Sequence, residues 1–82
     1  MRKIIKITIK DFAIICTIDN GDKYFYDMNF VKIDNHEMLI PLQDPNFFKK
    51  AYLEYGHLAW PNGYDIHANT ILREGRKIEE AA

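Results

Sequence analysis

The feature that most constrains this chain is a set of three β-rich runs in its first third. Residues 3–10 alternate with period two and place isoleucines on one face at positions 5, 7 and 9, which is typical of a half-buried strand. Residues 12–18 are nearly all apolar, as in a more central strand. Asn20-Gly21 suits a tight hairpin turn, and residues 23–28 resume as a strand. We therefore expect an antiparallel meander of three strands.

The middle of the chain has no clear period. Residues 29–43 scatter their apolar positions, which predicts an irregular connection packed on the sheet. Asp44 can then cap a short helical turn, with Pro45 at its first position. Residues 50–55 and 57–60 lie on either side of a glycine and predict a second, shorter hairpin.

The segment Trp60-Pro61-Asn62-Gly63 predicts a tight turn, because proline fixes the backbone of its second position and Asn-Gly suits the next two. We expect the Trp60 ring to pack inward. The Asp65 carboxylate is expected to accept hydrogen bonds from backbone N–H groups of the turn or of the helix that follows. That helix is expected over residues 67–74, ending at Gly75.

These elements predict one domain of the α+β class over residues 1–75. It comprises a small antiparallel sheet, built from the meander and the second hairpin, and a short C-terminal helix. Residues 76–82 lack an apolar face, so we expect a frayed tail there. A chain of 82 residues has room for one domain with a thin core.

Two motifs resemble the family of short bacterial proteins called domain of unknown function 2442. They are Leu-Gln-Asp-Pro-Asn-Phe-Phe at residues 42–48 and, more specific, Trp-Pro-Asn-Gly-Tyr-Asp-Ile within residues 58–66. The resemblance spans nearly the whole chain. It implies a small α+β fold without a known activity, cofactor or catalytic residue. It also implies a partner protein encoded beside this one, in an arrangement similar to toxin–antitoxin pairs. Arg73 departs from the tyrosine that many relatives carry, which puts the packing of the last helix in question.

Residues that carry chemistry are few and scattered. The chain has no serine, which excludes a Ser-His-Asp triad. The single cysteine, Cys16, lies in an apolar run and is expected to be a buried thiol. His36, His57 and His67 lack the spacing of a zinc site, so we expect neither a metal nor a cofactor. The sequence therefore favours a protein that acts by binding rather than by catalysis.

Charge and hydropathy predict a cytoplasmic location. The formal net charge of −1 gives no general attraction to nucleic acid or to an anionic membrane. Lysines interrupt the apolar run near the N-terminus, so no signal peptide is expected. No apolar stretch approaches the roughly 18 residues that span a bilayer, so no membrane partner is expected.

Aromatic residues make up 13% of the chain, which is more than a thin core can easily bury. Period two puts Tyr24 and Tyr26 on one strand face, where we expect exposed rings that contact a partner protein. The leading hypothesis is a non-enzymatic protein-binding module, the antitoxin-like member of a two-gene pair.

Two alternatives stay open. Lys6 and Lys10 share a strand face and, together with the tyrosines, would suit an accessory protein that binds nucleic acid. Asp65 and His67 lie close in the chain and would serve a small hydrolase-like enzyme.

Overall fold

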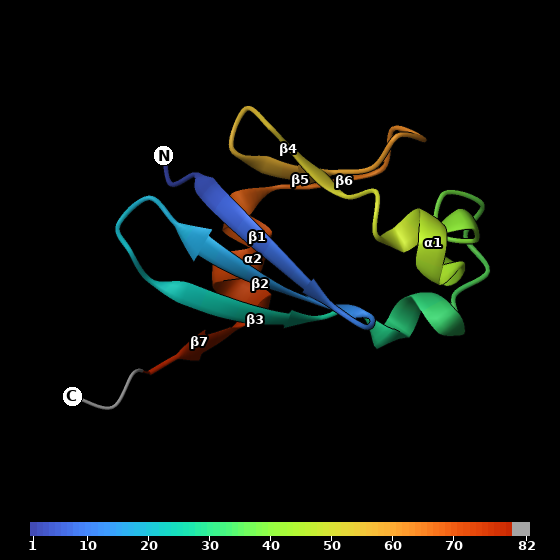
Figure 1. The fold of residues 1–82 in the computed structure, drawn as a ribbon, viewed down its shortest axis with the longest axis horizontal. Helices are drawn as coiled ribbons and strands as arrows, with labels where there is room; N and C mark the ends of the chain where they lie inside the picture. The colour runs from blue at the N-terminus through green and yellow to red at the C-terminus, as the bar shows by residue number, and fades with distance from the viewer. Residues whose placement is uncertain (80–82) are drawn as a thin grey trace.

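The structure, a computed structural model, describes residues 1–79 and forms two antiparallel sheets joined by short helices (Figure 1). The larger sheet has the order β1-β2-β3-β7. Its strands are β1 Ile4–Lys10, β2 Ala13–Ile18, β3 Lys23–Asp27 and β7 Arg76–Ile78. The smaller sheet has the order β4-β5-β6, with strands β4 Tyr52–Glu54, β5 His57–Ala59 and β6 Asp65–Ile66. This architecture confirms the predicted α+β class.

The first three strands form the expected meander, with β2 in its centre. Gly21 has a φ of +91° in the turn between β2 and β3, a conformation that glycine adopts without strain. The alternation predicted for β1 is wrong at its start. A β-bulge between Ile4 and Lys6 shifts the register, so Ile4 is buried and Ile5 is 60% exposed.

The pairing register gives the larger sheet an inner and an outer face. Ile14 lies opposite Tyr26, and Cys16 lies opposite Tyr24, so these four side chains share one face. Three of the four are buried, with Tyr24 half-buried, which makes this the inner face. Phe25, between the two tyrosines, therefore belongs to the outer face.

The connection after β3 is made of three short helical turns: η1 Asn29–Lys32, η2 Pro41–Gln43 and α1 Pro45–Phe48. Asp44 caps α1 as predicted, because its carboxylate oxygen Oδ1 accepts a hydrogen bond of 2.9 Å from the backbone N–H of Asn46. Pro45 occupies the first turn, where its missing N–H costs nothing.

The second hairpin is present, but it does not extend the first sheet. Tyr55 and Gly56 turn the chain between β4 and β5 with φ values of 52° and 81°, as in a tight hairpin turn. The N–H of Ile4 donates to the carbonyl of Gly56 at 2.8 Å, which ties the hairpin to β1. The sequence did not predict β6, which pairs with β5 and completes a separate sheet.

The predicted C-terminal helix is α2, Ala68–Glu74, and Gly75 follows it as expected. The prediction of a frayed tail is wrong for residues 76–78. Arg76 pairs with Phe25, and Lys77 with Tyr24, so β7 is the fourth strand of the larger sheet. Short strands can gain order from a neighbour's free edge without an apolar face of their own. Residues 80–82 of that tail lie outside the described residues.

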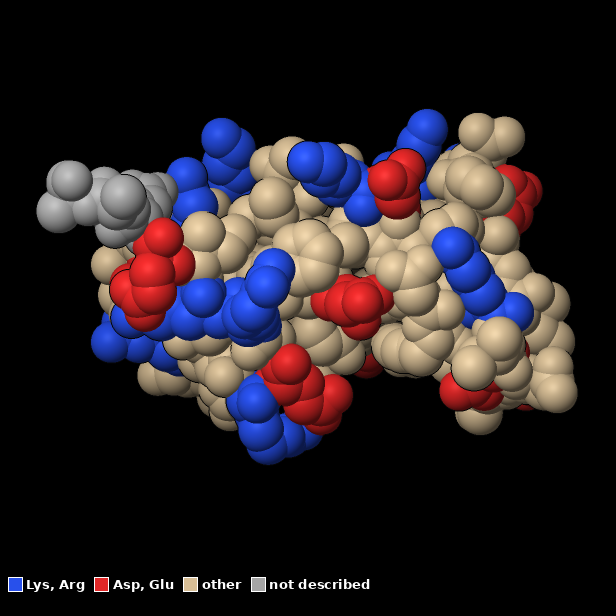
Figure 2. Space-filling view, turned by 90° about the horizontal axis from the view of Figure 1, so that it is seen from below, with Lys and Arg blue, Asp and Glu red and all other residues tan. Residues whose placement is uncertain are grey.

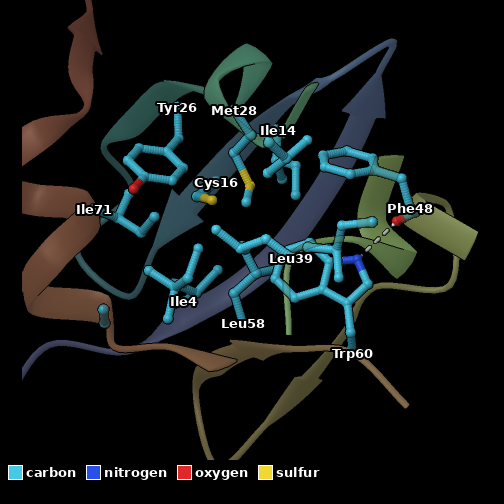
Figure 3. Packing of buried hydrophobic residues seen from close by; sticks show 14 of the residues in the cluster. Ile4, Ile14, Cys16, Tyr26, Met28, Leu39, Phe48, Leu58, Trp60 and Ile71 are labelled. Atoms are coloured by element: carbon cyan, nitrogen blue, oxygen red, sulfur yellow. Dashed lines mark hydrogen bonds between the residues drawn. The ribbon is translucent and has the colours of Figure 1, made fainter. Parts of the chain in front are cut away.

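The core lies between the inner face of the larger sheet, the smaller sheet and α2 (Figure 3). Trp60 is fully buried, as predicted, and its indole N–H donates to the carbonyl of Phe48 at 3.0 Å. The Phe48 ring packs against it, with the ring centroids 5.7 Å apart. Within residues 1–79, no helix is long and apolar enough to cross a membrane.

Candidate functional site

A hollow of about 440 Å³ lies between β3, η1, β6 and α2. We call it the acidic hollow. Its lining combines three carboxylates, three aromatic rings, a histidine, a threonine and two aliphatic side chains. The lining residues are Tyr26, Phe30, Asp34, Leu39, Tyr64, Asp65, Ile66, His67, Thr70 and Glu74.

Tyr26 supplies the deepest polar group. The expectation that Tyr24 and Tyr26 are exposed together is wrong, because both lie on the inner face and Tyr26 is only 7% exposed. Figure 3 shows the Tyr26 hydroxyl directed toward α2, beside Ile71. Within residues 1–79 this hydroxyl makes no hydrogen bond to the protein. Since it lies at the wall of an open hollow, it can bond to water or to a ligand.

Aromatic rings form two sides of the hollow. The Phe30 ring stands edge-on to Tyr26, with centroids 6.5 Å apart, and is 37% exposed. Tyr64 packs against the buried Trp60, with centroids 5.7 Å apart. Such rings offer a negative π face to whatever enters between them.

The Trp60–Gly63 turn, predicted from sequence, holds Tyr64 in place. The N–H of Gly63 donates to the carbonyl of Trp60 at 3.0 Å, and Gly63 has a φ of +92°. Asn62 secures the turn twice. Its side-chain amide donates to the carbonyl of Met38 at 3.0 Å, and its oxygen accepts from the N–H of Tyr64 at 3.2 Å. The sequence did not predict that Asn62 joins this turn to the connection between β3 and β4.

The carboxylates make the hollow electrostatically negative. Burial raises the pKa of Tyr64 above its ordinary value, and the charges of Asp34, Asp65 and Glu74 raise it further. Burial, and to a smaller extent the negative charge of Glu74, raises the pKa of Tyr26 to about 12. Both phenols therefore stay neutral at physiological pH and can donate or accept hydrogen bonds.

Two of the three carboxylates already have an interaction partner within the protein. Asp34 accepts from the backbone N–H of His36 at 2.9 Å, and Glu74 contacts the guanidinium of Arg73 at 3.1 Å. Both partners of the second pair are more than half exposed, so water weakens it. The side chain of Asp65 has no hydrogen bond or ion pair within the described residues. Its charge is the one most available to a ligand.

The predicted capping role of Asp65 is therefore wrong, and His67 takes it instead. Nδ1 of His67 accepts the N–H of Asn69 at 3.0 Å, and Nδ1 of His57 accepts the N–H of Ala68 at 3.1 Å. The two imidazoles stack with centroids 3.9 Å apart. Imidazole nitrogens thus satisfy the first free N–H groups of α2, which the strand position of Asp65 leaves out of reach.

Asp65 and His67 do not form an acid–base pair in this arrangement. Asp65 and His67 line the same hollow, but no hydrogen bond joins them in the described part of the chain. His67 uses Nδ1 as a helix cap, so a carboxylate does not orient its ring for proton transfer. Cys16 is fully buried in β2 and does not line the hollow, and burial raises its pKa to about 12. A thiol in that state is a poor nucleophile.

Metal binding has no support from the geometry either. Among residues 1–79, no three side chains of His, Cys, Asp or Glu are placed to hold a metal ion together. The stacked pair of His57 and His67 uses one ring nitrogen of each for the helix cap.

Sequence reasoning found Tyr26, Asp65 and His67 of the lining and missed the rest. Asp34 and Glu74 are far apart in the chain, and only the return of α2 to β3 brings them to one hollow. No local pattern marks such a pair. Of the other predicted motif residues, Asp44 caps α1 at the surface and Trp60 lies in the core, where it contacts Phe48 of α1 and Tyr64 of the hollow.

No protein-family model, curated protein or solved structure matches this chain. The resemblance to domain of unknown function 2442 stays a prediction that depends on the two motifs quoted above.

Proposed function

We propose that this protein is a non-enzymatic binding module whose acidic hollow takes a cationic side chain of a partner protein. The observation that carries the proposal is the Tyr26 hydroxyl. This hydroxyl lies at the wall of the hollow and has no hydrogen-bond partner within residues 1–79, although Tyr26 as a whole is more than nine-tenths buried.

A lysine or arginine side chain suits each part of the lining. Its N–H groups can donate to the Tyr26 oxygen and to the carboxylate of Asp65. Its charge can lie against the faces of Phe30 and Tyr64, a cation–π contact worth about 0.5–2 kcal/mol depending on desolvation. Asp34 and Glu74 at the rim would favour approach of a positive group over a negative one.

The proposed partner is a small protein encoded beside this one, with this chain as the antitoxin-like member of the pair. The family resemblance supplies that expectation, and the hollow supports it by offering a specific contact for a basic residue. The interface would be centred on the hollow rather than on Tyr24, which is half-buried on the inner face.

The chemistry of the hollow can be tested without the partner. Isotope-labelled protein is titrated with the capped peptide Gly-Arg-Gly while amide shifts are recorded by NMR. We expect shifts at Thr70 and Tyr64 and a dissociation constant on the order of 1 mM, since one side chain supplies few contacts. The same peptide with glutamine or glutamate in place of arginine should produce no such shifts. Equal shifts with the glutamate peptide would contradict the proposal.

Variants then assign the contact. Asp65→Asn and Tyr26→Phe should each weaken binding of the arginine peptide several-fold, and Glu37→Gln is a control because Glu37 is exposed and outside the hollow. The same variants apply to co-expression with the neighbouring gene, followed by capture of the complex. Capture that survives Asp65→Asn and Tyr26→Phe unchanged would place the interface elsewhere.

A further inference from the structure

The outer face of the larger sheet is uncovered. In Figure 1 this face is toward the viewer and no helix covers it, while α2 lies behind the strands. The register assigns its side chains in rows across the sheet. One row is Thr8, Ile15, Phe25 and Arg76; the next is Lys6, Thr17, Lys23 and Ile78; the third is Lys10, Ala13 and Asp27. We call this surface the open face.

Positive charge gathers on the open face although the chain as a whole has a net charge of −1. The three rows contain four cations, namely Lys6, Lys10, Lys23 and Arg76, and one carboxylate, Asp27. All four cations are exposed. Figure 2 shows mostly basic side chains along its upper edge, the side that faces the viewer in Figure 1. The face therefore attracts an anionic ligand.

An aromatic hollow lies at the end of the open face, next to the turn between β1 and β2. Its volume is about 260 Å³, and its lining combines Phe12, Ala13 and Phe25 with three polar residues, Lys10, Asp11 and Asn29. The guanidinium carbon of Arg76 lies 5.2 Å from the centroid of Phe25, and Nζ of Lys32 lies 4.7 Å from the centroid of Phe12. A cation thus lies over each ring, and a base that stacks on Phe25 would take the place of the Arg76 guanidinium, which can then bond to a phosphate.

We infer that the open face binds single-stranded nucleic acid, with a base against Phe25 and phosphates on Lys6, Lys10 and Arg76. Unpaired bases stack on aromatic side chains while a basic surface follows the backbone. Lys6 and Lys10 are separated by about 13 Å along β1, at 3.3 Å per residue, so they reach different phosphates. This inference does not depend on the acidic hollow, which lies on the other side of β3.

A single strand fits better than a duplex or an acidic peptide. The surface is a sheet face without a helix or ribbon that protrudes to enter a major groove. An acidic peptide would satisfy the cations but would leave the Phe12 and Phe25 surface unused. Only an unpaired nucleotide uses both the charge and the aromatic hollow.

Fluorescence anisotropy with labelled oligo(dT) of about 12 nucleotides tests the inference. Three phosphate contacts predict a slope of about −2 for log K against log salt concentration, since each contributes about −0.7 on a single strand. The double variant Lys6→Gln with Lys10→Gln should reduce that slope to about −0.7 and weaken binding at low salt at least tenfold. The matched control, Lys49→Gln with Lys50→Gln, removes two exposed lysines away from the open face and should change neither.

Phe25→Leu, checked for folding by circular dichroism, separates base stacking from charge. It should weaken oligo(dT) binding at least fivefold while leaving binding of an abasic oligonucleotide unchanged. The inference is overturned by the absence of binding at low salt, by equal loss in the Lys49/Lys50 control, or by tighter binding of a duplex of the same length or of poly-glutamate.

Discussion

The acidic hollow and the open face use opposite sides of one strand. On β3, Tyr26 points to the inner side and forms the wall of the hollow, while Phe25 points outward and forms part of the open face. The inner side is packed by α2 and the smaller sheet, which bury most of Tyr26, while the carboxylates that line the hollow stay exposed. The outer side is uncovered and keeps its lysines in water. A net charge near zero therefore conceals two surfaces of opposite sign, and the overall charge of a small domain does not predict the partners of each face.

The largest effect that separates the two regions is expected from the packed side. Trp60→Ala should lower the free energy of unfolding by about 3–5 kcal/mol, because it leaves a cavity and removes the hydrogen bond to the Phe48 carbonyl. Urea denaturation followed by circular dichroism measures this. A loss below about 1 kcal/mol would show that the inner side is loosely packed, which would break the comparison.

Alkaline pH should destabilise the packed side next. Burial raises the pKa of Tyr26 from 10.0 and of Cys16 from 9.0, each to about 12 in the folded chain. Below about pH 9 both groups are protonated in either state and have no effect. As pH rises from the unfolded pKa values of 9.0 and 10.0 to the folded value of about 12, the unfolded chain loses these protons first, so stability falls, by at most about 2.7 kcal/mol for Tyr26 alone.

Denaturation midpoints at pH 8, 10 and 11 would measure this loss. Tyr26→Phe should flatten the decline between pH 10 and 11, whereas Tyr55→Phe, at a tyrosine that is 87% exposed, should not. Equal flattening by both variants would mean that burial of Tyr26 is not the cause.

A smaller effect is expected at the N-terminus of α1, the helical turn whose Phe48 packs against Trp60 in the core. Asp44→Ala should cost about 1 kcal/mol, because the N–H of Asn46 loses its acceptor at the start of α1. Asp44→Ser should restore most of the stability, since a serine hydroxyl can also cap. If alanine and serine prove equal in thermal denaturation, the cap contributes nothing and α1 is held by Phe48 alone.

The smallest effect is expected on the open face. Lys6→Gln together with Lys10→Gln should change the free energy of unfolding by less than about 0.5 kcal/mol per site, because both side chains are exposed. Matched urea curves of the variant and the wild type would measure the change. A large loss of unfolding free energy would show that the lysines stabilise the sheet. The packed inner side and the exposed outer side would then no longer differ in how much they contribute to stability.

Much of the fold follows from local sequence, and the rest depends on distant partners. Asn20-Gly21, the cap at Asp44 and the Trp60–Gly63 turn act within a few residues, so the sequence predicts them. The strand at residues 76–78 has no such local signal. It forms because β3 offers a free edge, which depends on where α2 ends.

The site was harder to predict than the fold for the same reason. Period two correctly put Tyr24 and Tyr26 on one face, but it does not say which face is covered. The docking of α2 and the smaller sheet on one face decides that, and this docking is a tertiary feature. His67 caps α2 in place of Asp65 because β6 holds Asp65 in a strand.

The central claim is that the two surfaces recognise ligands of opposite charge independently. One NMR experiment tests it most directly: a single labelled sample is titrated first with the capped Gly-Arg-Gly peptide and then with oligo(dT). The account predicts that the peptide shifts amides of the hollow, such as Thr70, that oligo(dT) shifts those of the open face, such as Thr8 and Phe25, and that neither ligand displaces the other. Shifts of the same amides by both ligands, or displacement of one by the other, would contradict it.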